Sequence, residues 1–126
     1  MPLVTITVCK PKSTEFKSLI LDTVHAALQK VGVPATDKFQ RVLELEPEDF
    51  RFHANYPDVV GARNQDFVVI EILWSLGRSV KVKKELLHFL MQEFSANSME
   101  PENVMVVFKE TQWENWSFAG GRLLHT

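Results

Sequence analysis

Apolar and polar residues follow two different periods along this chain. Four short segments show either alternation or an almost continuous apolar run, and both patterns are typical of β-strands. They are residues 3–8, 39–45, 67–74 and 104–108. The third segment is the most continuous apolar run, which favours a central place in a sheet. The sequence therefore predicts four strands.

Two longer intervals have apolar residues at three- and four-residue spacing, which predicts an amphipathic helix in each. The first helix is expected to begin at Ser13 or Thr14 and to end at Gly32, a residue suited to a C-terminal cap. The second helix is expected to begin at Ser79 and to end near Asn97. Its apolar face is wider than one sheet needs, which either a broad core face or a subunit contact would explain.

The order of these elements repeats once. Strand, helix and strand occupy about residues 2–45 and again 67–110, at an offset of roughly 65 residues. A long loop, residues 46–66, separates the halves, and an irregular tail, residues 111–126, follows them. We expect a single domain over residues 1–126, in which each half is a right-handed crossover with parallel strands.

A local twofold axis between the halves would place the two leading strands antiparallel at the sheet centre, with both helices on one face. The expected fold class is therefore α+β, an α/β sandwich with a four-stranded mixed sheet built from duplicated β-α-β units. In this arrangement Pro2, at the start of the first strand, lies beside residues 76–78 at the end of the third. Residues 37–39 and the tail with Trp116 and Phe118 reach the same rim.

Pro2 is the first candidate for chemistry at this rim. Initiator methionine is commonly removed before a small residue, and the new N-terminus would then be a rigid secondary amine. An amine buried beside a cation loses affinity for its proton and becomes a base near neutral pH. The alternative is that Pro2 only starts an edge strand, where a missing N–H has no cost.

Other side chains expected at the rim would suit this chemistry. Arg78 is permanently charged, so it could depress the pKa of the amine and bind a substrate carboxylate with its bidentate fork; alternatively it is a solvated residue at a helix start. Asp37 could position a water or a hydroxyl, or it could form a turn. Trp116 and Phe118 could form the wall of an apolar pocket, or they could only attach the tail to the core.

The composition excludes several classes of function. The net charge is −2 and there is no basic block, so no nucleic acid is expected as a partner. No apolar run approaches the ~18 residues that span a bilayer, so no membrane is expected either. The single cysteine, Cys9, excludes an internal disulfide and fits a reducing cytoplasm. The four histidines show no metal-ligand spacing, so we expect neither a metal nor another cofactor.

Four motifs in order resemble the tautomerase superfamily, and within it the larger-subunit group that includes malonate semialdehyde decarboxylase. They are Met1-Pro2-Leu3, Asp37-Lys38-Phe39-Gln40-Arg41-Val42, Gly77-Arg78-Ser79, and Asn115-Trp116-Ser117-Phe118 with Gly120-Gly121-Arg122. The resemblance implies a homotrimer and a catalytic Pro2 exposed by removal of Met1. It also implies that Asp37 and Arg78 are catalytic. The resemblance implies Trp116 and Phe118 as pocket walls, and we expect Phe39 and Leu76 to be further substrate-binding residues.

The resemblance leaves three functions open. The decarboxylase has a second arginine two residues before the position of Arg78, where this chain has Leu76. A single cation and a more apolar wall favour a keto-enol substrate, so we expect a cofactor-free tautomerase of a small 2-oxo acid such as phenylpyruvate. Asp37 keeps a malonate semialdehyde decarboxylase or a haloacrylate hydratase-type lyase open. The third alternative is a non-catalytic trimeric binding protein on the same scaffold.

Overall fold

Four strands form one mixed sheet in the order β2-β1-β3-β4. The computed structural model describes residues 2–125. The strands are β1 (Leu3–Cys9), β2 (Gln40–Leu45), β3 (Val68–Ser75) and β4 (Val104–Thr111). The leading strands β1 and β3 pair antiparallel at the centre, while β2 runs parallel to β1 and β4 parallel to β3. The predicted topology is therefore confirmed.

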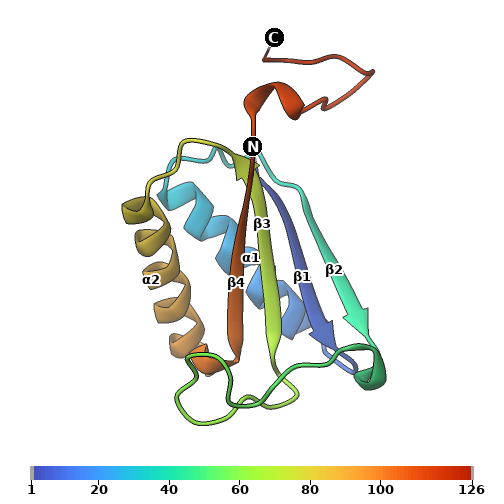
Figure 1. The fold of residues 1–126 in the computed structure, drawn as a ribbon, viewed down its shortest axis with the longest axis vertical. Helices are drawn as coiled ribbons and strands as arrows, with labels where there is room; N and C mark the ends of the chain where they lie inside the picture. The colour runs from blue at the N-terminus through green and yellow to red at the C-terminus, as the bar shows by residue number, and fades with distance from the viewer. Residues whose placement is uncertain (1, 126) are drawn as a thin grey trace.

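Two helices, α1 (Thr14–Lys30) and α2 (Val80–Ala96), pack on the same face of this sheet (Figure 1). The side chains of Ser13 and Ser79 accept hydrogen bonds from the backbone N–H groups of Phe16 and Val82, so both predicted N-terminal caps are present. Between the layers lies the apolar core. Its largest fully buried side chains include Ile6, Ile20, Leu28, Ile70, Ile72, Trp74, Leu86, Leu90 and Phe94.

No helix within residues 2–125 covers the opposite face of the sheet. Leu3, Leu43 and Leu73 lie on this face around a shallow hollow of about 140 Å³. Charged side chains share the hollow: Lys109 Nζ lies 2.6 Å from Glu71 Oε1. Leu43 is 46% exposed, so this face presents apolar surface that the chain itself does not bury.

Two predictions about the sheet need correction. Because β1 is central, Pro2 does not start an edge strand. Strand β4 also extends to Thr111, beyond the predicted end at residue 108, because its pairing with β3 continues to Ser75 and Thr111. The polar residues at this end of β4 interrupt the apolar pattern without ending the ladder.

The long loop, residues 46–66, lies at the end of the sheet opposite the N-terminus (Figure 1). It includes a short 3₁₀ helix, η1 (Pro47–Asp49), and an aromatic cluster in which the Phe52 and Phe67 ring centroids are 4.4 Å apart. Another 3₁₀ helix, η2 (Pro101–Asn103), lies next to this end of the loop, where the Asn103 side chain bonds Asn64. The loop therefore packs at the far rim, away from Pro2.

Neither α1 nor α2, nor any other helix within residues 2–125, is long and apolar enough to cross a membrane.

Candidate active site

The register of the central strands determines the surroundings of Pro2. Leu3 pairs with Leu73, so the next position in the antiparallel register places Pro2 opposite Trp74. The backbone N–H of Val4 donates to the carbonyl of Phe39 at 2.9 Å, which brings the entry of β2 alongside. Pro2 is buried at this rim.

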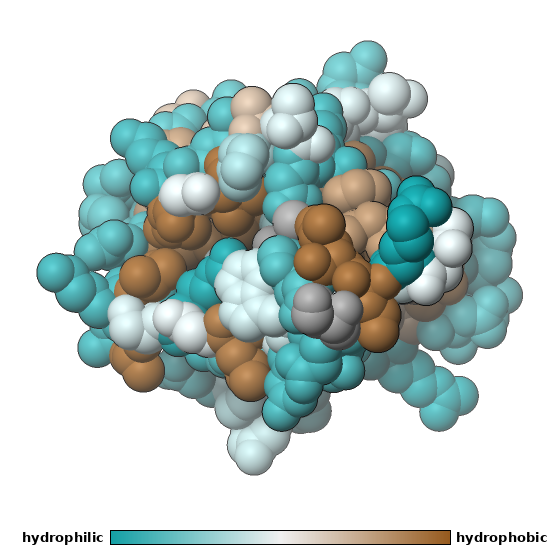
Figure 2. Space-filling model, turned by 90° about the horizontal axis from the view of Figure 1, so that it is seen from above, coloured by the Kyte–Doolittle hydropathy of each residue, from teal (hydrophilic) through white to brown (hydrophobic). Residues whose placement is uncertain are grey.

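A pocket of about 230 Å³ opens beside Pro2. Its lining residues are Pro2, Leu3, Phe39, Trp116, Ser117 and Phe118. The rings of Trp116 and Phe118 are stacked, with centroids 5.8 Å apart and planes at 6°. Figure 2 looks onto this rim and shows apolar residues gathered across its middle, with polar residues around them. The pocket is therefore a mainly apolar hollow with Pro2 in its wall.

Arg78 lies on the same rim, at the turn between β3 and α2. Its guanidinium donates a hydrogen bond from Nη1 to the carbonyl of Ser75 at 2.9 Å, and its Cζ lies 4.9 Å from the centre of a Trp74 ring. Burial lowers the pKa of the Arg78 guanidinium, and the nearby carboxylates of Asp37 and Glu110 partly offset this effect. The residue is half-buried, so it is not the solvated helix-start residue that was one alternative.

Asp37 comes from the segment before β2 and lies within electrostatic range of Arg78. Its backbone N–H donates to the carbonyl of Pro34 at 3.0 Å, so the residue also closes a turn. Its carboxylate is partly buried. The predicted turn at Asp37 is therefore present, and the positioning of a water or hydroxyl by its carboxylate stays a prediction.

The predicted site residues divide into two groups. Pro2, Phe39, Trp116 and Phe118 line the pocket. Asp37, Arg78 and Leu76 are not among its lining residues, and the strand topology places them at the same rim. Leu76 is 44% exposed, and its backbone N–H donates to the carbonyl of Thr111, which fixes the end of β3 against β4. The predicted removal of Met1 concerns a residue outside the described part of the chain.

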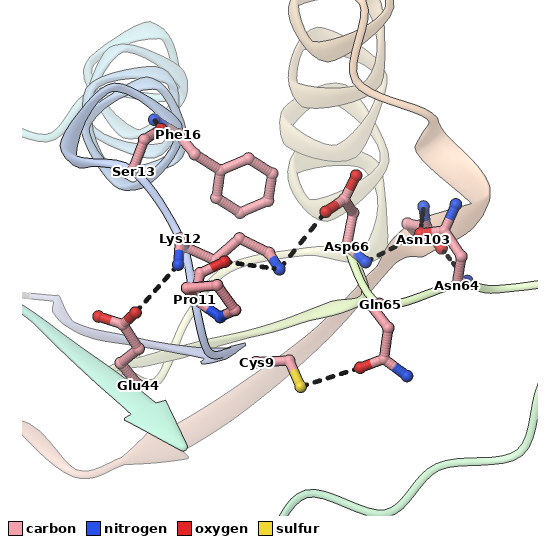
Figure 3. Close-up of polar contacts among 10 residues, drawn as sticks. All are labelled: Cys9, Pro11, Lys12, Ser13, Phe16, Glu44, Asn64, Gln65, Asp66 and Asn103. Atoms are coloured by element: carbon pink, nitrogen blue, oxygen red, sulfur yellow. Dashed lines mark hydrogen bonds and ion pairs between the residues drawn. The ribbon is translucent and has the colours of Figure 1, made fainter. Parts of the chain in front are cut away.

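The opposite rim offers a counterpart that helps to interpret this arrangement. Helix α1 begins at residue 14 and α2 at residue 80, so the residue two positions before each helix is Lys12 in one half and Arg78 in the other. Lys12 Nζ lies 3.4 Å from the carboxylate of Asp66, two residues before β3 (Figure 3). Each half therefore has a cation just before its helix, and the pseudo-twofold relation places that cation beside the segment that precedes the first strand of the other half. For Lys12 that segment contains Asp66, and for Arg78 it contains Pro2.

Trp113 is a residue of this rim that the sequence did not single out. It lies in the 3₁₀ helix η3 (Trp113–Asn115), and the centre of its ring is 5.8 Å from Arg78 Cζ. The tail was predicted only as irregular, and nothing in its spacing separated Trp113 from Trp116. Ser117 and Leu3 also line the pocket; both belong to the motifs quoted above, but neither was predicted to be a site residue.

Known proteins resemble this chain over most of its length. A family model described as "Tautomerase enzyme" matches residues 37–119, more than half of the chain. "Probable tautomerase YusQ" of Bacillus subtilis (strain 168) is 25% identical over 124 residues, which are 97% of this chain and 96% of that protein.

Solved structures of related proteins have the same fold. The crystal structure of FG41 malonate semialdehyde decarboxylase inhibited by 3-bromopropiolate matches with a TM-score of 0.86 at 24% identity, over 96% of this chain and 92% of that chain. A fused 4-OT wild-type symmetric trimer matches with a TM-score of 0.70 at 21% identity, over 96% and 94% of the two chains. At these identities the structural likeness supports the fold, and the extent of the family match establishes membership. The chain belongs to the tautomerase enzyme family.

Proposed function

We propose that this protein is a cofactor-free tautomerase of a small 2-oxo acid such as phenylpyruvate, with Pro2 as the general acid and base. The main supporting observation is that Pro2 lines an apolar pocket on the same rim as the Arg78 guanidinium. After removal of Met1, the proline nitrogen accepts the proton of the enol hydroxyl and returns a proton to C3. The former O–H electrons form the carbonyl, and the C=C electrons form the new C–H bond.

The surroundings of Pro2 favour the neutral amine that this step requires. An amine in an apolar pocket loses hydration that would stabilise its charged form, and a neighbouring cation opposes protonation further. Arg78 supplies that cation and binds the substrate carboxylate. Trp116, Phe118 and Phe39 contact the apolar part of the substrate, and Leu76 lies at the pocket margin. Asp37 is the third catalytic residue and orients a polar group of the substrate.

The test begins with the mass of the purified mature protein, which should lack Met1. This protein should ketonise phenylenolpyruvate, and Pro2→Ala should lower kcat at least about a hundredfold, as expected for loss of a general acid and base. Titration of the mature N-terminus by NMR should give a pKa below that of an ordinary α-amine. Retention of Met1, or a Pro2→Ala variant with unchanged kcat, would refute the mechanism.

Two alternatives follow from the same rim. A malonate semialdehyde decarboxylase or hydratase-type lyase is favoured by the closeness of Asp37 to Arg78, because a carboxylate and a cation together suit work on three-carbon acids. Release of carbon dioxide from malonate semialdehyde, dependent on Pro2 and Arg78, would support it. A non-catalytic binding protein instead predicts an ordinary pKa for the Pro2 amine and no turnover of either substrate.

We also propose that the protein assembles as a homotrimer through the open face of its sheet. The leucines on that face are partly exposed, and a second copy would bury them. Light scattering on the purified protein tests this directly: a monomeric mass would refute it. Cytoplasmic localisation is the matching expectation for a chain whose one cysteine, Cys9, is a buried free thiol.

A further inference from the structure

The guanidinium of Arg78 lies close to two tryptophan rings. Its Cζ is 4.9 Å from the centre of a Trp74 ring and 5.8 Å from the centre of a Trp113 ring. Within these distances a cation is attracted to the electron-rich ring face. A third contact, from Nη1 to the carbonyl of Ser75, fixes one corner of the guanidinium. Two rings and one carbonyl together restrict both its position and its plane.

The two rings differ in what the fold requires of them. Trp74 is fully buried and stacks on Phe108 with centroids 5.2 Å apart, so it belongs to the core. Trp113 is 41% exposed and lies in the tail beyond β4, outside the buried core cluster. Its other neighbour is the ring of His125, at 5.0 Å, which is also exposed. Contact with Arg78 is the feature that distinguishes this tryptophan.

The backbone holds Trp113 in place through the short helix η3. The Asn115 side-chain amide donates to Thr111 Oγ1 at 2.7 Å, and the Asn115 backbone N–H donates to the Gln112 carbonyl at 3.0 Å. Thr111 is the last residue of β4, so these bonds tie the turn to the sheet. The turn therefore holds the Trp113 ring near the Arg78 guanidinium at this rim.

We infer that Trp113 is a positioning residue that holds the Arg78 guanidinium for carboxylate recognition. The inference rests on the proposed function, because it assigns a task to the arginine that binds the substrate carboxylate. A guanidinium that is already oriented loses less side-chain entropy on binding than one that moves freely. The fork then meets the carboxylate in the plane that two parallel hydrogen bonds require.

A double-mutant cycle of Trp113→Ala and Arg78→Ala tests this inference. In the wild-type background, Trp113→Ala should raise KM for phenylenolpyruvate roughly threefold to thirtyfold, the range of a cation–π contact, with kcat within about twofold. In the Arg78→Ala background the same substitution should change KM by less than about twofold, because its target is gone. Trp113→Phe, which keeps a ring, should recover most of the loss.

The cycle separates positioning from a purely structural role. If Trp113 acted by placing the neighbouring Trp116, its effect would persist when Arg78 is absent, and that additive result would overturn the inference. Tyr56→Ala is the matched control, since Tyr56 is 70% exposed and lies in the loop at the far rim. It should leave KM unchanged.

A second readout separates this inference from the proposed reaction. The wild type and the three variants of the cycle should be compared by calorimetry for Kd of 3-phenylpropionate, a carboxylate that cannot enolise to the substrate. If the wild type binds 3-phenylpropionate but does not ketonise phenylenolpyruvate, the tautomerase proposal is refuted, and the cycle measured in Kd still decides the role of Trp113. Absence of carboxylate binding in the wild type would overturn the inference as well.

Discussion

Replacing Arg78 by lysine keeps a positive charge at the rim but removes the planar fork. The guanidinium has one nitrogen, Nη1, on the carbonyl of Ser75 and a flat face against Trp74. Its Nε and Nη2 form the second edge, which suits a carboxylate. A lysine ammonium is a point charge on a flexible stem, so it cannot keep the Ser75 contact and also form two parallel bonds to the substrate.

The size of the effect follows from the number of bonds lost. A hydrogen bond to a charged group contributes about 1.5–3 kcal/mol, and Arg78→Lys should lose one such bond to the carboxylate. That loss corresponds to a fall in kcat/KM of about tenfold to 150-fold. Arg78→Ala removes the charge as well, so its kcat/KM should fall further than that of the lysine variant.

The assay follows ketonisation of phenylenolpyruvate by absorbance, with the melting temperature of each variant as a check on folding. Arg51→Lys is the matched control, because Arg51 is exposed in the loop at the opposite rim, and its kcat/KM should equal that of the wild type. The reasoning fails if Arg78→Lys is as active as the wild type, since charge alone would then suffice. It fails equally if Arg78→Ala is no slower than Arg78→Lys.

Two further predictions concern stability. Glu44 accepts a hydrogen bond from Lys17 Nζ, at 2.9 Å, and another from the Lys12 backbone N–H, and both lower its pKa. The ionised carboxylate therefore stabilises the fold at pH values above the ordinary glutamate pKa, and this contribution disappears as the pH falls through the lowered pKa. Glu44→Gln should therefore lower the melting temperature at about pH 7 and have little effect at about pH 2, and an equal effect at both values would contradict it. Phe94→Ala should lower the free energy of unfolding by about 3–5 kcal/mol, because the ring is fully buried in the core, and urea unfolding at neutral pH would contradict this with a loss under about 1 kcal/mol.

The sheet and both helices could be predicted because each half repeats the same simple patterns. The apolar run at residues 67–74 is buried on one face along nearly its full length, as a central strand requires. Ser13 and Ser79 are effective caps because each precedes a helix and bonds a backbone N–H three residues later. The twofold assumption then fixed which strand ends would meet, and the order β2-β1-β3-β4 agrees with it.

The site could be predicted only as far as the backbone topology reaches. Strand order brings Pro2, Arg78 and Asp37 to one rim, but it does not say which side chains enclose a cavity. That depends on the tail, where irregular backbone and the short helix η3 place Trp113 near Arg78 and Trp116 at the pocket. Such turns depend on individual hydrogen bonds and not on a repeating pattern of apolar residues, so the amphipathic pattern does not predict them.

A duplicated fold has two equivalent rims, and the path of the chain explains why only one of them suits a site of this kind. Strands β2 and β3 end and begin at the same rim, so the segment that joins the halves must cross that rim, and loop 46–66 fills it with its own aromatic cluster. At that rim Lys12 already forms an ion pair with Asp66, which belongs to the segment that joins the two halves (Figure 3). At the other rim the proposed removal of Met1 would place the Pro2 amine before β1, a group that no internal residue can supply. The tail leaves from β4 at this same rim and adds the aromatic wall. A circular permutant that opens the chain within loop 46–66 and joins the original ends should therefore keep the fold and lose the proposed tautomerase activity, since it keeps every side chain of the rim and removes only the proposed amine.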